Sequence, residues 1–118
     1  MKTIVNKQID LRDRTLAFSK DIIRFCKPLE RSLISRSVID QLIRSSTSIG
    51  ANFIEAKNSG SKRDFRNKVL ISKKEASETL YWLKITEEFV NNEQLQNLQR
   101  ECQEIILILQ SIINTLNA

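Results

Sequence analysis

Hydrophobic residues recur at intervals of three and four along almost the whole chain. The first amphipathic segment shows the spacing clearly, with apolar or small residues at Leu11, Thr15, Phe18, Ile22, Phe25 and Leu29. Side chains at these intervals share one face of an α-helix. The pattern repeats three more times and predicts helices at approximately residues 10–27, 33–58, 62–90 and 93–116.

Short polar or helix-breaking sequences separate these segments. Pro28 cannot donate a backbone N–H and disfavours helical backbone in the residue before it, so it ends the first helix. Gly60 is the expected stop after the second helix. Ser61, followed three residues later by Asp64, predicts an N-cap for the third helix. Connections this short make consecutive helices antiparallel neighbours.

The fold class predicted is all-α, an antiparallel up-and-down four-helix bundle. Only two glycines and one proline occur in 118 residues, too few turn residues for a many-stranded sheet. The length suits one hydrophobic core, so we expect a single domain over residues 1–118.

Small residues interrupt the apolar stripes of the two central helices. Ser46 and Gly50 lie on one stripe, and Ser72 and Ala76 lie on the other. Small side chains at facing positions let helices approach closely, and buried hydroxyls can bond to carbonyls one turn back. We therefore expect close packing between the second and third helices. The alternative is a polar contact surface, lined by Ser45, Thr47, Ser48 and Asn52.

Asn52 and Glu55 lie one turn apart on the second helix. A carboxylate here, near Arg44, Lys57 or Lys68, predicts a buried polar network that fixes the helix register. Without a histidine or an activated nucleophile, the pair does not form a catalytic site.

Charge is distributed unevenly. The net charge is +4 over residues 1–56, +6 over residues 57–74 and −5 over residues 75–118. A basic zone of this kind suggests an anionic partner. The candidate nucleic-acid-binding residues are Lys57, Lys62, Arg63, Arg66, Lys73 and Lys84. The alternative is a solvated face that Asp64, Glu75 and Glu78 neutralise. No aromatic residues alternate with these bases, so single-strand sequence recognition is not indicated.

An apolar run in the fourth segment suggests self-association. Residues 105–109 are five consecutive apolar positions, which cover more than one helix face and need either a wide core or another subunit. Two aromatics also lie off the main stripe of the third helix. The candidate oligomer interface comprises Tyr81, Trp82, Ile106, Ile108 and Ile113.

Histidine is absent, which removes the commonest general base and metal ligand. Cys26 and Cys102 match no metal or redox spacing and are expected as small core residues. No apolar stretch is long enough for a membrane span or a signal peptide. We therefore expect a cytoplasmic protein that is not an enzyme and has no catalytic residues, metal or cofactor.

The central sequence resembles a known family. "SIGANFIEA" at residues 48–56 and "SKRDFRNKVLISKKEASETLYWLK" at residues 61–84 look like the four-helix-bundle proteins encoded in intervening sequences of bacterial 23S rRNA genes. The motif falls on Ser48, Ile49, Ala51, Asn52, Glu55, Ser61, Asp64, Phe65, Lys68, Glu75, Glu78, Thr79, Tyr81, Trp82 and Leu83. The outer helices match by pattern alone.

The resemblance implies a cytosolic, ring-shaped homopentamer with no established enzymatic activity. It also implies a relation to the accessory proteins of diversity-generating retroelements, which associate with a reverse transcriptase and nucleic acid. Two functions follow as hypotheses. The first is an RNA- or ribonucleoprotein-associated module that uses the basic surface. The second is a scaffold that recruits a protein partner such as a reverse transcriptase without binding nucleic acid alone.

Overall fold

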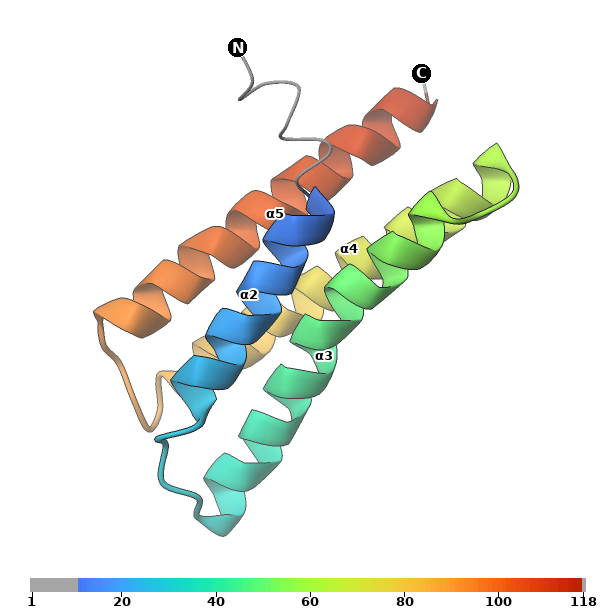
Figure 1. Cartoon of the computed structure of the whole chain (residues 1–118). Coiled ribbons are helices and arrows are strands. Elements are labelled where there is room, and N and C mark those ends of the chain that lie inside the picture. The colour runs from blue at the N-terminus through green and yellow to red at the C-terminus, as the bar shows by residue number, and fades with distance from the viewer. Residues whose placement is uncertain (1–10, 118) are drawn as a thin grey trace.

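Four antiparallel helices form the bundle in a computed structural model that describes residues 11–117 (Figure 1). They are α2 (Leu11–Cys26), α3 (Leu33–Lys57), α4 (Lys62–Thr86) and α5 (Glu93–Asn117). Each helix runs against its neighbours in sequence, and α5 returns to lie beside α2. The predicted all-α bundle is confirmed. The predicted helix start at residue 10 and the domain limits at residues 1 and 118 lie outside the described residues.

The helix ends follow local capping chemistry. The Ser32 side chain accepts the Ser35 N–H at 3.1 Å, while the Ser35 hydroxyl oxygen accepts the Ser32 N–H at 2.8 Å. This reciprocal pair begins α3. Ser61 caps α4 as predicted, and its hydroxyl accepts the Asp64 N–H at 3.0 Å.

The predicted end of α4 was wrong, and so was the stop signal predicted for α3. Helix α4 ends at Thr86, not at residue 90, because residues 87–89 form a tighter turn in which the Glu87 and Glu88 N–H groups bond three residues back. Gly60 does not provide a left-handed stop for α3, since no described glycine has positive φ. Asn58 caps the helix instead, and its N–H bonds to the Ile54 and Glu55 carbonyls, both at 3.2 Å.

The core consists of the predicted apolar stripes, which meet along the bundle axis. The largest fully buried side chains are Phe18, Phe25, Phe53, Leu11, Ile22, Ile39, Leu42, Ile49, Leu83, Leu95, Ile105 and Leu109. Burying a side chain of this size contributes roughly 1.5–3 kcal/mol to stability. Helices α3 and α4 share the longest contact, whereas α2 and α5 share the shortest. The contact between α3 and α4 is therefore the main contact of the bundle.

Buried hydroxyl groups link the helices across these contacts. Ser72 of α4 donates to the Ile49 carbonyl of α3 at 2.7 Å, and the Thr79 and Ser45 hydroxyls lie 2.9 Å apart. On the other side of α3, the Ser19 hydroxyl of α2 lies 3.2 Å from the Ser46 carbonyl. Within the described residues, every buried side-chain nitrogen or oxygen has a hydrogen-bond partner. Ser45 and Ser46 are thus interior residues with satisfied hydrogen bonds, whereas Thr47 is exposed and Ser48 and Asn52 are half-buried.

Gly50 allows a close approach, but to a different helix from the one predicted. A Cβ at this position would lie 2.9 Å from Thr15 Oγ1 and 3.2 Å from Thr15 Cβ. The glycine therefore faces α2, not Ser72 and Ala76 of α4. Helix α3 has two small-residue contacts, one with α2 through Gly50 and one with α4 through Ser45.

Replacement of Gly50 by alanine is expected to destabilise the bundle by about 1 kcal/mol. Overpacking costs about 1–3 kcal/mol, and the higher helix propensity of alanine recovers about 1 kcal/mol. In a Thr15→Ala background the oxygen at 2.9 Å is gone while the Cβ at 3.2 Å remains, so the same Gly50→Ala change should destabilise less. Urea unfolding of the four proteins measures the coupling. Gly60→Ala is the control, because nothing lies within 4 Å of an added Cβ there. Equal effects of Gly50→Ala in both backgrounds would contradict the close contact with Thr15.

Candidate nucleic-acid interface on α4 and α5

Three basic residues form a row along one side of α4. Arg66, Lys73 and Lys84 fall within roughly 20° of one another on the helix. At 1.5 Å per residue, the row is about 27 Å long. Lys84 is exposed, while Arg66 and Lys73 are half-buried, so part of each of their side chains packs on the bundle surface.

Contacts with α5 show on which side of α4 the row lies. Arg66 Nε donates to Oδ1 of Asn117 at 2.8 Å, which holds the guanidinium against the last turn of α5. Deeper in the same contact, Cys102 Sγ donates to the Ala76 carbonyl at 3.2 Å. The row therefore lies on the side of α4 that borders α5. The terminal guanidinium nitrogens form no hydrogen bond with a described residue and can donate to an anion.

The neighbouring side of α5 carries neutral amides. Gln99 Nε2 lies 3.3 Å from the Leu83 carbonyl and 2.7 Å from Glu87 Oε2, which places this side of α5 against α4. At 100° per residue, further amides follow the same side. They are Gln103, Gln110, Asn114 and Asn117. We call the α4 row and these five amide residues the α4–α5 face.

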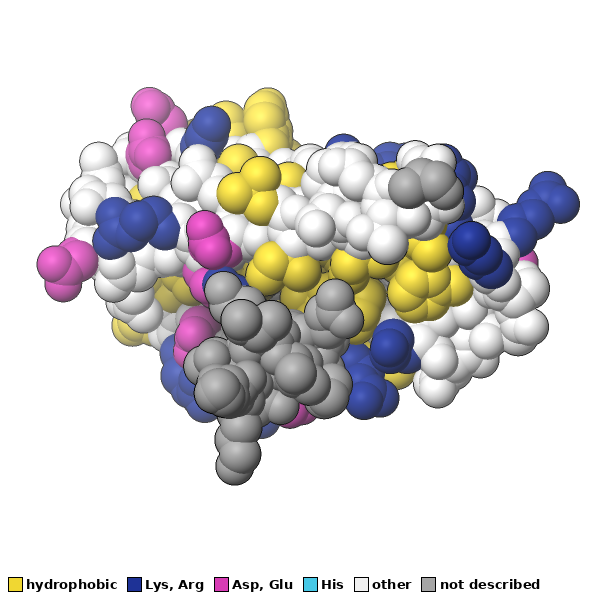
Figure 2. Space-filling view, turned by 90° about the horizontal axis from the view of Figure 1, so that it is seen from above, with side chains coloured by type: hydrophobic (Ala, Val, Ile, Leu, Met, Phe, Trp, Pro, Cys, Tyr) yellow, Lys and Arg dark blue, Asp and Glu magenta, His cyan; other side chains and the backbone are white. Residues whose placement is uncertain are grey.

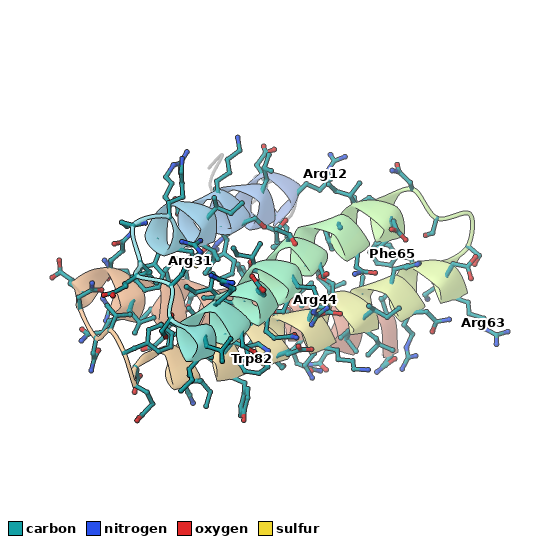
Figure 3. The ribbon with its side chains drawn as sticks, turned by 90° about the horizontal axis from the view of Figure 1, so that it is seen from below. Arg12, Arg31, Arg44, Arg63, Phe65 and Trp82 are labelled. Carbon is teal, nitrogen blue, oxygen red and sulfur yellow. The ribbon has the colours of Figure 1, made fainter. Side chains whose placement is uncertain are left out.

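The acidic residues of α4 lie on its opposite side. Arg44 of α3 places Nη2 3.3 Å from Glu75 Oε1 and 2.5 Å from Glu78 Oε2. The Trp82 indole N–H also donates to Glu78 Oε2, at 3.1 Å. Figure 3 shows Arg44 and Trp82 on this side of the bundle. The Arg44 guanidinium, and then the indole N–H, hold the pKa of Glu78 below its usual value.

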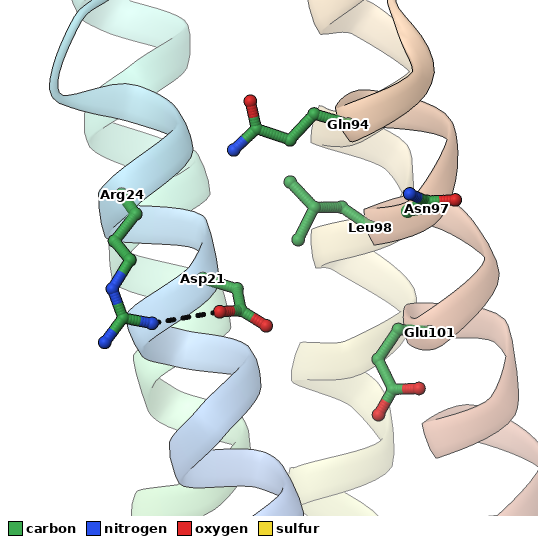
Figure 4. A pocket seen from close by; sticks show the side chains of 6 residues that line it. All are labelled: Asp21, Arg24, Gln94, Asn97, Leu98 and Glu101. Carbon is green, nitrogen blue, oxygen red and sulfur yellow. Dashed lines mark hydrogen bonds and ion pairs between the residues drawn. The ribbon is translucent and has the colours of Figure 1, made fainter.

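The acidic residues of α5 turn toward α2. Arg14 Nε lies 2.6 Å from Glu101 Oε2, and Arg14 Nη2 lies 3.9 Å from Glu104 Oε1. Glu101 also lines a cavity of about 420 Å³ between α2 and α5, beside the Arg24–Asp21 ion pair (Figure 4). The −5 charge of the last third of the chain therefore does not neutralise the α4 row, apart from Glu87 near one end.

The other predicted bases form a separate group at the α3–α4 turn. Lys57, Lys62 and Arg63 are all exposed there, and Figure 3 shows Arg63 extending away from the bundle. In Figure 2, Lys and Arg side chains gather toward this end, whereas Asp and Glu side chains predominate at the other. None of the six predicted bases forms an ion pair with a described residue. Glu75 and Glu78 pair with Arg44, and Asp64 forms no ion pair with a described residue, so the solvated face considered from sequence lacks the expected salt bridges.

The predicted network around Asn52 and Glu55 is not buried. Glu55 Oε1 pairs with Lys68 Nζ at 2.8 Å, but the two side chains are 59% and 38% exposed. Asn52 donates to the Ser48 carbonyl of its own helix at 2.8 Å. Surface ion pairs of this exposure contribute little, about 0–1 kcal/mol. The buried links between α3 and α4 are the hydroxyl contacts instead.

The residues predicted for the oligomer interface lie partly in the core and partly on the surface. Ile113 is only 4% exposed, and it belongs to the core because α5 buries a wide stripe. Ile106 and Ile108 are half-buried and pack against that core, and so does Trp82. Tyr81 is 57% exposed and packs edge-on against the Trp82 ring.

Sequence reasoning missed Leu107, which is 64% exposed. It is the central residue of the apolar run and lies about 200° from Ile105 and Leu109 around the helix. Measuring that angle from the sequence would have identified it as the outward-facing member. Leu107 and Tyr81 flank the α4–α5 face, one on each helix.

Both cysteine thiols are buried in the core. Burial raises the pKa of the Cys26 thiol to about 11 and that of the Cys102 thiol to about 12, so both remain protonated near neutral pH. Residues 11–117 contain no cluster of three or more potential metal ligands. Within the same range, none of the helices combines the length and hydrophobicity needed to span a membrane. What the α4–α5 face offers is positive charge and hydrogen bonding.

Comparison with known proteins decides the family. A model of the 23S rRNA-intervening sequence protein family matches residues 7–111. The chain belongs to this family. The crystal structure of a protein of unknown function from the S23 ribosomal protein family of Bacteroides thetaiotaomicron is similar to this chain, with 35% sequence identity. It superposes with a TM-score of 0.77 over 87% of this chain and 97% of the other. No curated protein matches the chain.

The pairing of Glu78 with Arg44 predicts a titration that the single tryptophan reports. In the wild-type protein, Trp82 fluorescence should change with a midpoint below pH 4.5, the ordinary pKa of a glutamate. Arg44→Ala removes the main stabiliser of the carboxylate, so the midpoint should rise toward 4.5. Lys73→Ala, on the other side of α4, is the control and should leave the midpoint unchanged. A shift with Lys73→Ala, and none with Arg44→Ala, would place Glu78 beside the basic row.

Proposed function

We propose that this 23S rRNA-intervening sequence protein is a non-catalytic, homo-oligomeric binding module that associates with RNA or ribonucleoprotein through its α4–α5 face. The observation that carries the proposal is the row of Arg66, Lys73 and Lys84, none of which pairs with an acid of the described chain. Nearby carboxylates are engaged by Arg44 and Arg14 instead.

Binding would be mainly electrostatic. Lysine and arginine side chains that neutralise phosphates release condensed counterions, and the affinity therefore falls steeply as salt rises. Asn117 engages Arg66 through Nε, and the terminal guanidinium nitrogens can donate to a phosphate. Lys57, Lys62 and Arg63 at the α3–α4 turn would extend the positive surface beyond the end of the row.

Self-association would multiply this surface. The family resemblance suggests a pentamer, and a ring would repeat the row around its axis. An oligomer interface would bury exposed apolar side chains, and each of the four helices carries at least one. The largest exposed fractions belong to Leu33 at 86%, Ile34 at 76%, Leu107 at 64%, Tyr81 at 57% and Leu16 at 52%.

The second candidate function is a scaffold that recruits a partner enzyme, such as a reverse transcriptase, without binding nucleic acid alone. The family resemblance implies a relation to retroelement accessory proteins, and such a relation would fit this role. Tyr81 and Leu107 favour it structurally, because both are exposed at the edges of the α4–α5 face. Tyrosine is enriched among the residues that anchor protein interfaces, and Leu107 would add apolar contact area.

A reducing compartment such as the cytoplasm fits the proposal. Cys26 and Cys102 are both free thiols, and free thiols are typical of compartments in which disulfides do not persist.

Light scattering of the purified protein with a generic structured RNA tests the proposal. The mass should correspond to an oligomer, and it should increase with RNA at about 50 mM salt but not at about 200 mM salt. Arg66→Glu/Lys73→Glu should abolish the increase. The matched control is Lys20→Glu/Lys27→Glu, which changes the net charge equally at exposed positions of α2 and the turn after it.

The other outcomes separate the candidates. RNA binding that survives charge reversal on α4 but fails in the control would place the site elsewhere. An oligomer that ignores RNA at both salt concentrations would contradict the RNA-binding proposal and favour the scaffold. In that case, Tyr81→Ala/Leu107→Ala should abolish partner binding that Arg66→Glu/Lys73→Glu leaves intact. A monomer would contradict the proposed self-association.

A further inference from the structure

We propose that the nucleic acid recognised by the α4–α5 face is double-helical RNA, contacted across its shallow minor groove. This inference rests on the proposed function and specifies its ligand. The observations that carry it are the width of the face, the amides beside the cations, and the positions of the aromatic side chains.

The face is too wide for a groove of B-form DNA. It is built from two adjacent helices, whose axes lie about 8–10 Å apart when packed, and each helix has a diameter of about 10–12 Å with its side chains. The resulting surface is about 20 Å across, whereas the DNA major groove is about 12 Å wide and the minor groove about 6 Å. On DNA, neither helix can enter a groove alone, because the other lies beside it. The minor groove of A-form RNA is wide and shallow, so a broad surface can lie across it.

The chemistry of the two helices matches that groove. Arg66, Lys73 and Lys84 supply positive charge along about 27 Å of α4, suited to the phosphates at the groove edge. The amide side chains of α5 both donate and accept hydrogen bonds. The ribose 2′-hydroxyl does the same, and it lines the RNA minor groove and is absent from DNA. Gln103 and Gln110 are therefore the residues that would distinguish RNA from DNA, Gln110 through its amide oxygen because its Nε2 donates to Asn114 Oδ1 at 2.8 Å.

Single-stranded nucleic acid fits the face poorly. Single-strand sites use a groove in which successive bases stack on aromatic side chains. Here Phe18, Phe25 and Phe53 are buried in the core, and Trp82 donates to Glu78 on the other side of α4. Phe65 packs against the core and lines a cavity with Phe53 and Ile112, and Phe89 lies beside the turns at the other end of the bundle. Tyr81 borders the face, where it packs against the Trp82 ring with centroids 5.2 Å apart. Cavities of about 220–520 Å³ lie elsewhere, between α2 and α5, beside the α3–α4 turn, among α3, α4 and α5 at that end, and against the turns at the other end.

Fluorescence anisotropy with three labelled probes tests the inference. The probes are a blunt RNA duplex, a DNA duplex of the same sequence, and one RNA strand alone, each at about 50 mM salt. The RNA duplex should bind at least about fivefold more tightly than either of the others. Gln103→Ala/Gln110→Ala should reduce that preference over DNA while leaving DNA affinity unchanged. The control is Gln94→Ala/Asn97→Ala, which removes two amides from the side of α5 that borders the α2–α5 cavity. Circular dichroism verifies that each variant folds.

The other outcomes distinguish failure of this inference from failure of the proposed function. Tighter binding of the single strand, or equal binding of RNA and DNA duplexes, would overturn this inference and leave the proposed function intact. Loss of preference in the Gln94/Asn97 variant, but not in the Gln103/Gln110 variant, would also overturn it. Failure of all three probes to bind would contradict the proposed function itself.

Discussion

The close approach of α3 to its two neighbours is the constraint on which the rest of the structure depends. Gly50 leaves room for Thr15 of α2, and the Ser72 hydroxyl reaches the Ile49 carbonyl across the α3–α4 contact. A hydrogen bond to a specific carbonyl is satisfied in only one alignment of the helices. An apolar contact alone would tolerate sliding by a turn, whereas a buried hydroxyl that lost its acceptor would cost about 1–3 kcal/mol. The small and polar residues of α3 therefore set the alignment, and the larger apolar side chains supply most of the stability.

That alignment places the acidic and the basic side chains of α4 on opposite sides of the helix. With Ser45 beside Thr79, Arg44 meets Glu75 and Glu78 on the outer side of the α3–α4 contact. The acids of α4 are thus turned away from its cations, and Arg14 holds Glu101 on the far side of α5. Exposed ion pairs add little stability. Their larger consequence here is that they engage the carboxylates elsewhere and leave the α4–α5 face positive. The helix alignment set by the buried hydroxyls therefore determines the charge of this surface.

The helices could be predicted from sequence because steps of three and four follow directly from helix geometry, as the stripe from Leu11 to Phe25 shows. The end of α4 could not, since Val90 continues the apolar spacing and nothing local excludes another helical turn. Predicting which helix Gly50 faces, or that Glu75 pairs with Arg44, requires the relative rotation of neighbouring helices, which the pattern of one chain segment does not contain. The net charges of the sequence segments did not predict which surface is positive, for the same reason. The acidic last third of the chain is adjacent to the α4 row in sequence, but its glutamates on α5 point toward α2.

Lysine footprinting tests the central claim most directly, that the unpaired cations of α4 are the nucleic-acid contact. The protein would be acetylated briefly, with and without a saturating RNA duplex at low salt, and each lysine quantified by mass spectrometry. We predict that RNA protects Lys73 and Lys84 while Lys20 and Lys27, on the α2 side of the bundle, react equally in both samples. Protection of Lys20 and Lys27, with Lys73 and Lys84 unchanged, would contradict the account, because it would show that the row left positive by the fold is not the surface that binds.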